Sequence, residues 1–407
     1  NRKTRMKILL GGVPFGRKNI GDEAILASVV GLVRKAAPGA TLTVSTDDPA
    51  TAARLGVEVC PLFGFDVVPY SDDEMKATMA RHDAYIWSGA TGLSDYPDRA
   101  CQLLSAARAA GCRRVIWNVG MNSELNPAKY KLQGRRLQFA RAADTLTLGI
   151  FGIRHRMESA MESRARAALC AELSDCQLVV TRDPQSAREL ERSGLPASKV
   201  LVGADSALVQ AQSPWPPAAL SPDDAARLEI PGIKRVGLCV SAQREITRWP
   251  ELVAALDRIL ALPGVEIVGL PMNPVTDLEI LQRLQRDVAK PAAFQVIAAV
   301  TEPEDITALA ARMDVLISSR LHLLILGSIN HVPLVGISRG SKVDNFLAPF
   351  GLDAVGSVES CDFDRLVAET ARWLDARDEF RTRSEKVRAD LLARLDRAMA
   401  RLKEVLR

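Results

Sequence analysis

Several features that mark other protein classes are missing or scarce in this chain. No apolar run approaches the roughly 18–20 residues that a membrane-spanning helix needs. The formal net charge is only +4 over 407 residues, so bulk electrostatics do not favour a nucleic-acid partner. We therefore expect no transmembrane helix and no binding to nucleic acid.

Cysteine and histidine are also sparse, with seven and four copies. The cysteines are odd in number, scattered, and without a Cys-x-x-Cys pair, which argues against a disulfide framework and against a zinc site. The histidines offer no metal-binding spacing either. We therefore expect no bound metal and a reduced, cytoplasmic protein. The residues concerned are Cys60, Cys101, Cys112, Cys170, Cys176, Cys239, Cys361, His82, His155, His322 and His331.

The composition that is present fits a globular protein with ample core, since 47% of residues are apolar and 25% are charged. Apolar runs of strand length alternate with amphipathic helical stretches almost throughout. This alternation predicts an α/β fold with parallel sheets covered on both faces. The predicted strands are Met6–Leu10, Thr41–Thr46, Val57–Leu62, Asp83–Ser88, Val115–Val119, Leu178–Thr181, Val236–Val240, Val265–Leu270, Phe294–Val300, Asp314–Ser318 and Pro333–Ile337.

The length is sufficient for two domains of ordinary size. Proline and serine cluster around Gln212–Asp223 and the periodicity stops there, which is typical of an interdomain linker. We expect the two Rossmann-like domains to face one another across a cleft, with ligands beyond the carboxyl ends of the strands. The predicted parts are an N-terminal domain over 1–211 on the acceptor side, a linker over 212–232, a C-terminal domain over 233–378, and an amphipathic helix over 379–407 that packs across both domains.

The most informative motif begins at the strand Asp314–Ser318. Arg320 and His322 follow it inside an otherwise apolar stretch, and charge-capable groups are costly to bury unless they are paired or used. One interpretation is structural, with Arg320 paired to Asp314 and His322 satisfied in the core. The other is functional. If Arg320 is still extended and a helix begins near Leu321, both side chains face one ligand, and the pair can bind an anion and supply a general acid.

A second polar cluster lies in the run Gly11–Glu23, after the first strand. Asn19 can cap the next helix, with Asp22 three residues later, so a capping box explains part of the pattern. The glycine spacing fits neither Gly-x-Gly-x-x-Gly nor a P-loop, which excludes a nucleotide fingerprint here. Plain capping and a ligand-facing loop both remain open.

A third cluster begins with Arg182, directly after the strand Leu178–Thr181. Asp183 is typical of an N-cap, Pro184 of a first helical position and Gly194 of a helix stop. A guanidinium beside the free amide groups of a helix N-terminus suits a carboxylate or a phosphate. A surface salt bridge is the alternative.

Three further segments place polar groups just after a strand. Asp205 follows a short apolar run, Pro271–Asp277 follows another, and Arg339 and Lys342 follow Pro333–Ile337. Arg339 and Lys342 can line the same cleft, although a solvated loop is the more typical role for at least one of them.

In their order and spacing, these motifs resemble those of the polysaccharide pyruvyl transferase family. Each motif is weak alone, and the resemblance rests on the whole set, which runs over most of the chain. The main departure is Ser338-Arg339-Gly340, where family members often carry an aromatic residue and an acid. The matching motifs are Asn19-Ile-Gly21-Asp22, Ser88-Gly89-Ala-Thr-Gly92, Arg182-Asp-x-x-Ser186, Gly203-Ala-Asp205, the exit Pro271–Asp277, Ser319-Arg320-Leu321-His322, and Val332-Pro-Leu-Val-Gly-Ile with Lys342-Val.

The resemblance implies a GT-B-like fold and a reaction in which the pyruvyl group of phosphoenolpyruvate moves onto two sugar hydroxyls as a ketal, releasing phosphate. The implied acceptor is a polysaccharide, a glycolipid or a lipid-linked precursor of the cell envelope, and no cofactor is implied beyond the donor substrate. Arg320 matches the family's donor-binding arginine, His322 its catalytic histidine and Arg182 its second arginine. The implied substrate-binding residues are Asn19, Gly21, Asp22, Gly89, Asp205, Ser319, Leu321 and Lys342.

The chemistry of these residue types agrees with that reaction. Phosphoenolpyruvate is a small, multiply charged anion, so its site needs several cations rather than a nicotinamide site or a metal cluster. Protonation of its methylene carbon produces an oxocarbenium-like centre, for which one acid and two arginines suffice. Two alternatives remain. One is a GT-B-type sugar-nucleotide glycosyltransferase, whose ribose-binding acid is not apparent after Val332–Ile337, and the other is a non-catalytic sugar- or anion-binding relative.

Basic residues concentrate between Lys129 and Arg166, where nine Lys/Arg face three acids and the apolar stretch Leu146–Ile153 interrupts them. One interpretation is a solvated basic helix beside an ordinary core segment. The other is peripheral contact with the anionic inner face of a membrane, which would bring the acceptor-side domain to a lipid-linked sugar.

Overall fold

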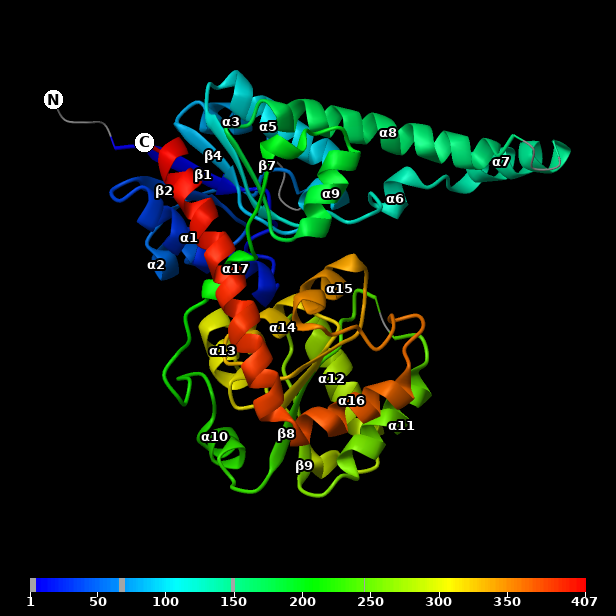
Figure 1. The fold of residues 1–407 in the computed structure, drawn as a ribbon. Coiled ribbons are helices and arrows are strands. Elements are labelled where there is room, and N and C mark those ends of the chain that lie inside the picture. Colours follow the sequence, from blue (N-terminus) through cyan, green and yellow to red (C-terminus); the bar gives the residue numbers. More distant parts are fainter. Residues whose placement is uncertain (1–4, 66–69, 148–150, 245) are drawn as a thin grey trace. The chain divides into compact units, whose positions relative to one another are not determined.

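The computed structural model describes residues 5–65, 70–147, 151–244 and 246–407. It divides into two compact units that do not follow the chain in simple order. The first unit holds the residues up to Pro14, Arg34–Gly203 and Ala398–Arg407, and the second holds Phe15–Val33 and Ala204–Arg397. Each unit is built on its own parallel sheet with interleaved helices (Figure 1). The predicted α/β class with two parallel sheets is confirmed.

The first sheet has seven strands in the order β3-β2-β1-β4-β5-β6-β7. Strand β1 pairs with β2 on one side and β4 on the other, so that Ile8 lies opposite both Leu42 and Ala84. The chain runs outward from β1 to β3 and then builds the other half, which makes the β1–β4 pair a topological switch point. The strands are β1 (Lys7–Gly11), β2 (Thr41–Ser45), β3 (Glu58–Cys60), β4 (Ala84–Trp87), β5 (Arg113–Val119), β6 (Leu178–Thr181) and β7 (Val200–Val202).

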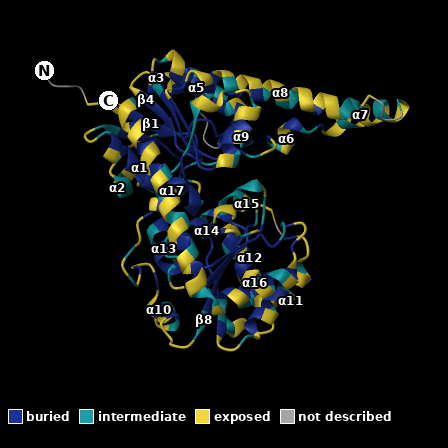
Figure 2. Ribbon diagram, viewed as in Figure 1, coloured by how far each residue is buried: buried dark blue, intermediate teal, exposed yellow. Residues whose placement is uncertain are grey.

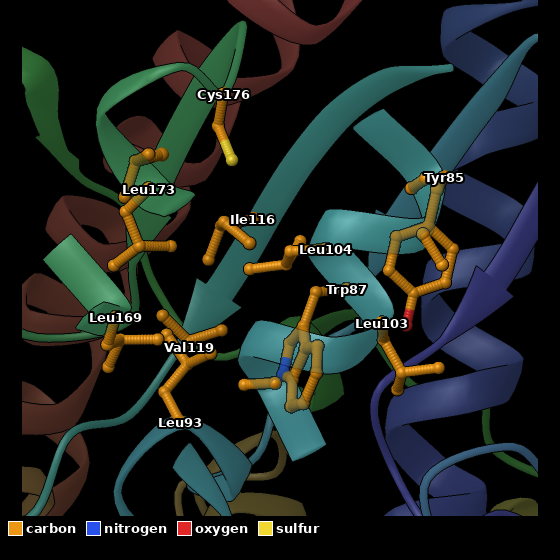
Figure 3. Packing of buried hydrophobic residues seen from close by; sticks show 14 of the residues in the cluster. Tyr85, Trp87, Leu93, Leu103, Leu104, Ile116, Val119, Leu169, Leu173 and Cys176 are labelled. Carbon is orange, nitrogen blue, oxygen red and sulfur yellow. The ribbon is translucent and has the colours of Figure 1, made fainter. Parts of the chain in front are cut away.

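The core of the first unit forms because its strands are apolar on both faces. Trp87 of β4 and Ile116 of β5 are fully buried, in one cluster with Leu104 and Leu173 (Figure 3). Leu104 comes from α5 and Leu173 from α8, so this cluster fastens the long helix α8 to the sheet. The helices of this unit are α2 (Ala50–Leu55), α3 (Asp72–Met79), α4 (Gly92–Asp95), α5 (Pro97–Ala109), α6 (Pro127–Tyr130), α7 (Gly134–Leu146), α8 (Ile153–Ser174) and α9 (Pro184–Arg192), with the 3-10 turn η1 (Ala197–Lys199).

The second sheet has five strands in the order β10-β9-β8-β11-β12, all parallel. The chain moves from β8 outward to β10 and then crosses to β11, so the switch point of this unit is the β8–β11 pair. The strands are β8 (Lys234–Cys239), β9 (Val265–Gly269), β10 (Phe294–Val296), β11 (Val315–Ser318) and β12 (Leu334–Gly336).

The helices of the second unit cover this sheet, and α14 packs directly on β11 and β12. Every residue of α14 except His322 is buried, which explains why the segment is apolar on all sides. The helices are α10 (Pro222–Leu228), α11 (Trp249–Leu260), α12 (Thr276–Asp287), α13 (Pro303–Ala310), α14 (Leu321–Ser328), α15 (Ser341–Leu347) and α16 (Phe363–Asp375), with the 3-10 turns η2 (Ser206–Val209), η3 (Pro291–Ala293) and η4 (Ala348–Phe350).

Two helices contribute residues to both units. α1 (Ile20–Ala36) begins in the second unit and ends in the first. α17 (Arg377–Val405) also begins in the second unit, and its residues from Ala398 onward belong to the first. Among the described helices, none combines the length and the apolar content that a bilayer crossing requires.

The observed division differs from the predicted boundaries of 1–211, 212–232, 233–378 and 379–407. The chain leaves the first unit after Gly203, and the predicted linker lies inside the second unit, where it contains α10. Phe15–Val33 also belongs to the second unit, and one of its contacts there is a 2.9 Å hydrogen bond from the Ile20 N–H to the carbonyl of Met272. This contact joins positions far apart in sequence, and no local pattern encodes it.

All predicted strands are present, with ends shifted by a few residues. The largest change is Phe294–Val300, of which only the first three residues form β10. The edge strand β7 has only three residues, all of them half-buried. The run is too short for the sequence to show the alternation of apolar and polar residues that marks a strand.

Candidate active site

Polar residues follow the carboxyl ends of four neighbouring strands of the second sheet. Ser241 follows β8, Asp277 follows β9, Arg320 follows β11 and Arg339 follows β12. Because the strands are parallel, their carboxyl ends meet at one edge of the sheet, where open α/β sheets bind ligands. All four residues belong to the second unit.

His322 is held at the start of α14. Arg320 is still extended, with φ −96° and ψ 116°, and the helix begins at Leu321, as the sequence predicted. The His322 side chain is 14% exposed, and its Nε2 lies 3.8 Å from Oδ2 of Asp205. The Asp205 carboxylate is itself fixed, because it accepts a 3.0 Å hydrogen bond from the Ala207 N–H at the start of η2.

The first turn of α1 packs against the imidazole. A Cβ placed on Gly21 would lie 2.4 Å from Nδ1 and 2.8 Å from Cβ of His322, so only glycine fits here without a shift of the histidine. Asn19 caps α1 through its Oδ1, which accepts from the Gly21 N–H, and its Nδ2 donates to Oδ2 of Asp22 at 2.8 Å. Asn19 thus caps α1 as predicted, although Asp22 binds the Asn19 side-chain amide instead of its backbone N–H. The same turn lies beside His322.

Asp22 is a buried carboxyl group. Burial raises its pKa from 3.8 to about 7, with a further contribution from the Glu23 carboxylate. Lys342, the Asn19 amide and Arg320 act in the opposite direction. Asp22 therefore lies within electrostatic range of two cations of the site and changes charge near neutral pH.

Arg320 is paired with a carboxylate, but its partner is Asp277. Its Nε and Nη2 donate to the two carboxylate oxygens at 2.9 and 2.7 Å, and the Asp277 side chain is fully buried. The interpretation that pairs Arg320 with Asp314 is wrong. Asp314 instead accepts from the Arg235 N–H and pairs with Arg377.

Gln243 lies between Arg320 and a second arginine, Arg339. Oε1 of Gln243 lies 3.3 Å from Nη1 of Arg320 and 3.4 Å from Nη1 of Arg339. Nη1 of Arg339 also donates to Oγ of Ser241 at 2.6 Å, while its buried Nε has no hydrogen-bond partner among the described residues. Burial and the charge of Arg320 lower the pKa of Arg339 to about 10.

Two predicted substrate-binding residues have structural roles as well. The Ser241 N–H donates to Oγ of Ser319 at 2.9 Å, which ties the ends of β8 and β11 together. Leu321 is 4% exposed and belongs to the apolar core. Sequence reasoning did not single out Ser241 and Gln243, although both follow a predicted strand, Val236–Val240, and the strand-exit rule points to them.

Arg182 and Gly89 lie in the first unit. Arg182 is 7% exposed, follows β6, and has its Nε 3.6 Å from Oδ2 of Asp183. Asp183 caps α9 by accepting from the Ser186 N–H at 2.7 Å, and Pro184 is the first residue of that helix, as predicted. A Cβ on Gly120 would lie 2.6 Å from Cζ of Arg182.

Gly89 follows β4 with φ +124°, a conformation that favours glycine. It is therefore at the switch point of the first sheet, next to the end of β1. Within the described part of the chain, no group of three or more His, Cys, Asp and Glu side chains is arranged to hold a metal ion.

Known structures with the same fold include sugar-nucleotide enzymes. HepE from Anabaena in complex with UDP-glucose has a TM-score of 0.59 at 12% identity and covers 98% of both chains. The S. aureus MnaA–UDP structure has a TM-score of 0.61 at 9% identity, covering 94% of this chain and 91% of that one. UDP-GlcNAc 2-epimerase from Methanocaldococcus jannaschii has a TM-score of 0.56 at 11% identity, covering 91% and 93%. At these identities the likeness shows a shared GT-B-type fold.

Sequence comparison gives the family. A search finds no match among curated proteins. The model of the family described as polysaccharide pyruvyl transferase matches residues 19–341, a range that contains Asn19, Arg182, Asp205 and the Ser319–His322 motif. The chain belongs to the polysaccharide pyruvyl transferase family.

Proposed function

We propose that this protein transfers the pyruvyl group of phosphoenolpyruvate onto two hydroxyls of a saccharide, forming a ketal and releasing phosphate. The observation that carries the proposal is the junction of β11 and α14. It places an imidazole in the first turn of a helix, two residues after a buried arginine and 3.8 Å from a carboxylate. An acid beside cations is what protonation of an anionic enol ester needs.

The donor would be bound by the cations at the strand exits. Arg320 is oriented by Asp277, so its pairing leaves Nη1 as the donor that is not bound to that carboxylate. Arg339 adds a buried Nε–H, and Lys342 adds an ammonium within electrostatic range of Asp22. Planar guanidinium groups suit both the phosphate and the carboxylate of phosphoenolpyruvate. By family resemblance, Arg182 is a further donor-binding residue.

His322 would act as the general acid. Asp205 stabilises the positive charge of the imidazolium, which then gives its proton to the methylene carbon of phosphoenolpyruvate. The electron pair of the carbon–carbon double bond forms the new C–H bond, and the central carbon becomes an oxocarbenium-like centre. A sugar hydroxyl attacks this carbon and returns a proton to His322.

The second half of the reaction releases phosphate. The bond between the central carbon and the phosphate oxygen breaks, the phosphate leaves with that electron pair, and the second hydroxyl attacks the same carbon. Of the two hydroxyl protons, one replaces the proton that His322 gave to the new methyl group and the other leaves with phosphate. The proposed reaction needs no cofactor. Its acceptor is a polysaccharide, a glycolipid or a lipid-linked precursor.

The fold neighbours that bind UDP or UDP-glucose suggest the alternative of sugar-nucleotide chemistry. One experiment separates the two functions. The protein is incubated with a panel of saccharide acceptors and either phosphoenolpyruvate or a panel of UDP-sugars. We expect acceptor-dependent phosphate release from phosphoenolpyruvate and no UDP release. UDP release without phosphate release would favour the glycosyltransferase.

A further inference from the structure

The helical hairpin of α7 and α8 in the first unit combines positive charge with exposed apolar side chains. Both helices extend away from the sheet of that unit (Figure 1), and exposed residues cover much of their surface (Figure 2). Between Lys129 and Arg166 there are nine Lys/Arg and three Asp/Glu. The rest of the chain has 44 Lys/Arg and 46 Asp/Glu, so the positive charge of the protein is concentrated here.

The three acids of this segment are used within the hairpin. Asp144 accepts from the N–H groups of Ile153 and Arg154, where α8 begins. Glu158 accepts from the Leu132 N–H and pairs with Arg154, and Glu162 pairs with Arg166. In the described ranges, five arginines of the segment form no ion pair with an acidic side chain, unlike Lys129, Lys131, Arg154 and Arg166. The five are Arg135, Arg136, Arg141, Arg156 and Arg164.

The outward face of α7 is apolar as well as basic. Leu146 is 85% exposed and Phe139 is 69% exposed, the two highest values among large apolar side chains of the described residues. They are seven positions apart, so they lie on the same side of the helix, with Arg135 in line. Phe151, close to the start of α8, is 53% exposed.

A shallow hollow of about 270 Å³ lies beside Phe139. Its lining is almost entirely apolar, and Arg135 and Arg136 are among the residues that form it. This pairing matches the two parts of a phospholipid, an acyl region and an anionic headgroup. The hollow is lined by Leu132, Arg135, Arg136, Phe139, Met157 and Met161.

We propose that this hairpin is the site by which the protein attaches peripherally to an anionic bilayer surface. Phe139 and Leu146 enter the interface, and the arginines contact lipid phosphates. Phe139 and Leu146 are the most exposed large apolar side chains of the described residues, and they lie beside the unpaired arginines. A second copy of the chain is a poor occupant, because two segments of the same positive charge would repel each other. The predicted stretch Leu146–Ile153 lies only in part within the described residues, and the proposal does not depend on 148–150.

Vesicle sedimentation tests the proposal independently of catalysis. The full chain is mixed with vesicles of phosphatidylcholine containing phosphatidylglycerol, at low and at high salt. We expect binding at low salt that weakens at high salt, and none to pure phosphatidylcholine. Each basic residue near an anionic surface strengthens attachment about fivefold. The double variant Arg135→Gln/Arg136→Gln should therefore bind about 25-fold more weakly, and Phe139→Ser/Leu146→Ser should lose attachment at both salt concentrations.

Matched variants elsewhere serve as controls. Val59→Ser/Ile230→Ser removes two exposed apolar side chains, and Arg286→Gln/Arg381→Gln removes two exposed arginines. Both should bind as the parent does, and circular dichroism should show that all four variants are folded. The proposal is overturned if the parent does not bind at low salt, if binding is indifferent to salt, or if the control pairs weaken it equally. Concentration-dependent dimerisation through the hairpin without vesicle binding would also overturn it.

Discussion

The two sheets each deliver a buried arginine to the start of a helix, and the two arginines meet different carboxylates. Arg320 leaves β11 and is held by two hydrogen bonds to Asp277, which is fully buried. Arg182 leaves β6 and lies 3.6 Å from Asp183, a residue whose carboxylate already caps α9. The local sequence pattern is the same, a strand followed by arginine and a helix.

The difference shows that the carboxylate partner sets the orientation and the effective charge of an arginine in this position. Asp277 is 43 residues from Arg320 in sequence, and it both orients the guanidinium and neutralises much of its charge. The net positive charge of the second sheet edge therefore depends on Arg339 and Lys342. Arg182 is accompanied by a carboxylate that is its sequence neighbour and that is shared with a helix N-terminus.

The largest difference between the two exits should appear at the residue two positions after each arginine. In the second unit this is His322, and in the first it is Pro184. We expect His322→Ala to lower turnover by about 10²–10⁴-fold through loss of the general acid, with phosphoenolpyruvate affinity largely kept. Pro184→Ala should leave turnover near that of the parent. Steady-state phosphate release and calorimetric titration with phosphoenolpyruvate measure both, and near-parental turnover of folded His322→Ala would exclude the acid role.

The two carboxylates should differ in what they contribute to stability. Asp277→Ala leaves Arg320 buried without its partner, which typically costs about 3–5 kcal/mol of unfolding free energy. Asp183→Ala removes a helix cap, which costs about 1 kcal/mol. Denaturant unfolding of both variants measures the difference, and equal losses would contradict the contrast between the two exits.

One glycine packs against each site, Gly21 against His322 and Gly120 against Arg182. Gly21→Ala would push on Cβ and the ring of His322, whereas Gly120→Ala would push on the flexible end of Arg182. A rigid imidazole cannot move aside as an arginine head can, so we expect Gly21→Ala to lower turnover about tenfold or more. Gly120→Ala should act mainly on the KM for phosphoenolpyruvate. Separate kcat and KM values for the two variants test this, and a larger kcat loss for Gly120→Ala would reverse the interpretation.

The last prediction concerns pH. The folded state raises the pKa of Asp22 from 3.8 to about 7, so it binds the Asp22 proton more tightly than the unfolded chain does. The resulting stabilisation is present below pH 3.8 and is lost as the pH rises through about 7. Asp22→Asn should flatten the thermal stability profile over that range and stabilise the protein above it. An unchanged profile would show that Asp22 does not cause the pH dependence of thermal stability.

Local pattern was sufficient for the predicted strands, for several helix starts and for the backbone conformation just before His322. The extended Arg320, the helix start at Leu321 and the Asp183–Pro184 cap all follow from residue type and spacing. These features depend on a few neighbours in sequence, and for such features single-sequence reasoning has a physical basis.

Long-range packing accounts for what the sequence did not reveal. The assignment of Phe15–Val33 to the second unit rests on contacts such as Ile20 with Met272. The choice of Asp277 over Asp314 as the partner of Arg320 depends on which loops meet at the sheet edge. Asp314 precedes β11, at the opposite end of that strand from Arg320, whereas Asp277 follows β9 and reaches the same edge of the sheet as Arg320.

The most direct measurement of the central claim is the fate of the donor carbon atoms. The protein is incubated in D₂O with phosphoenolpyruvate and a saccharide acceptor, and the product is examined by NMR. A ketal-forming pyruvyl transferase would yield a quaternary carbon bearing a methyl group that contains one deuterium. Retention of the vinylic methylene in the product, or no transfer from phosphoenolpyruvate to any acceptor, would contradict the proposed function.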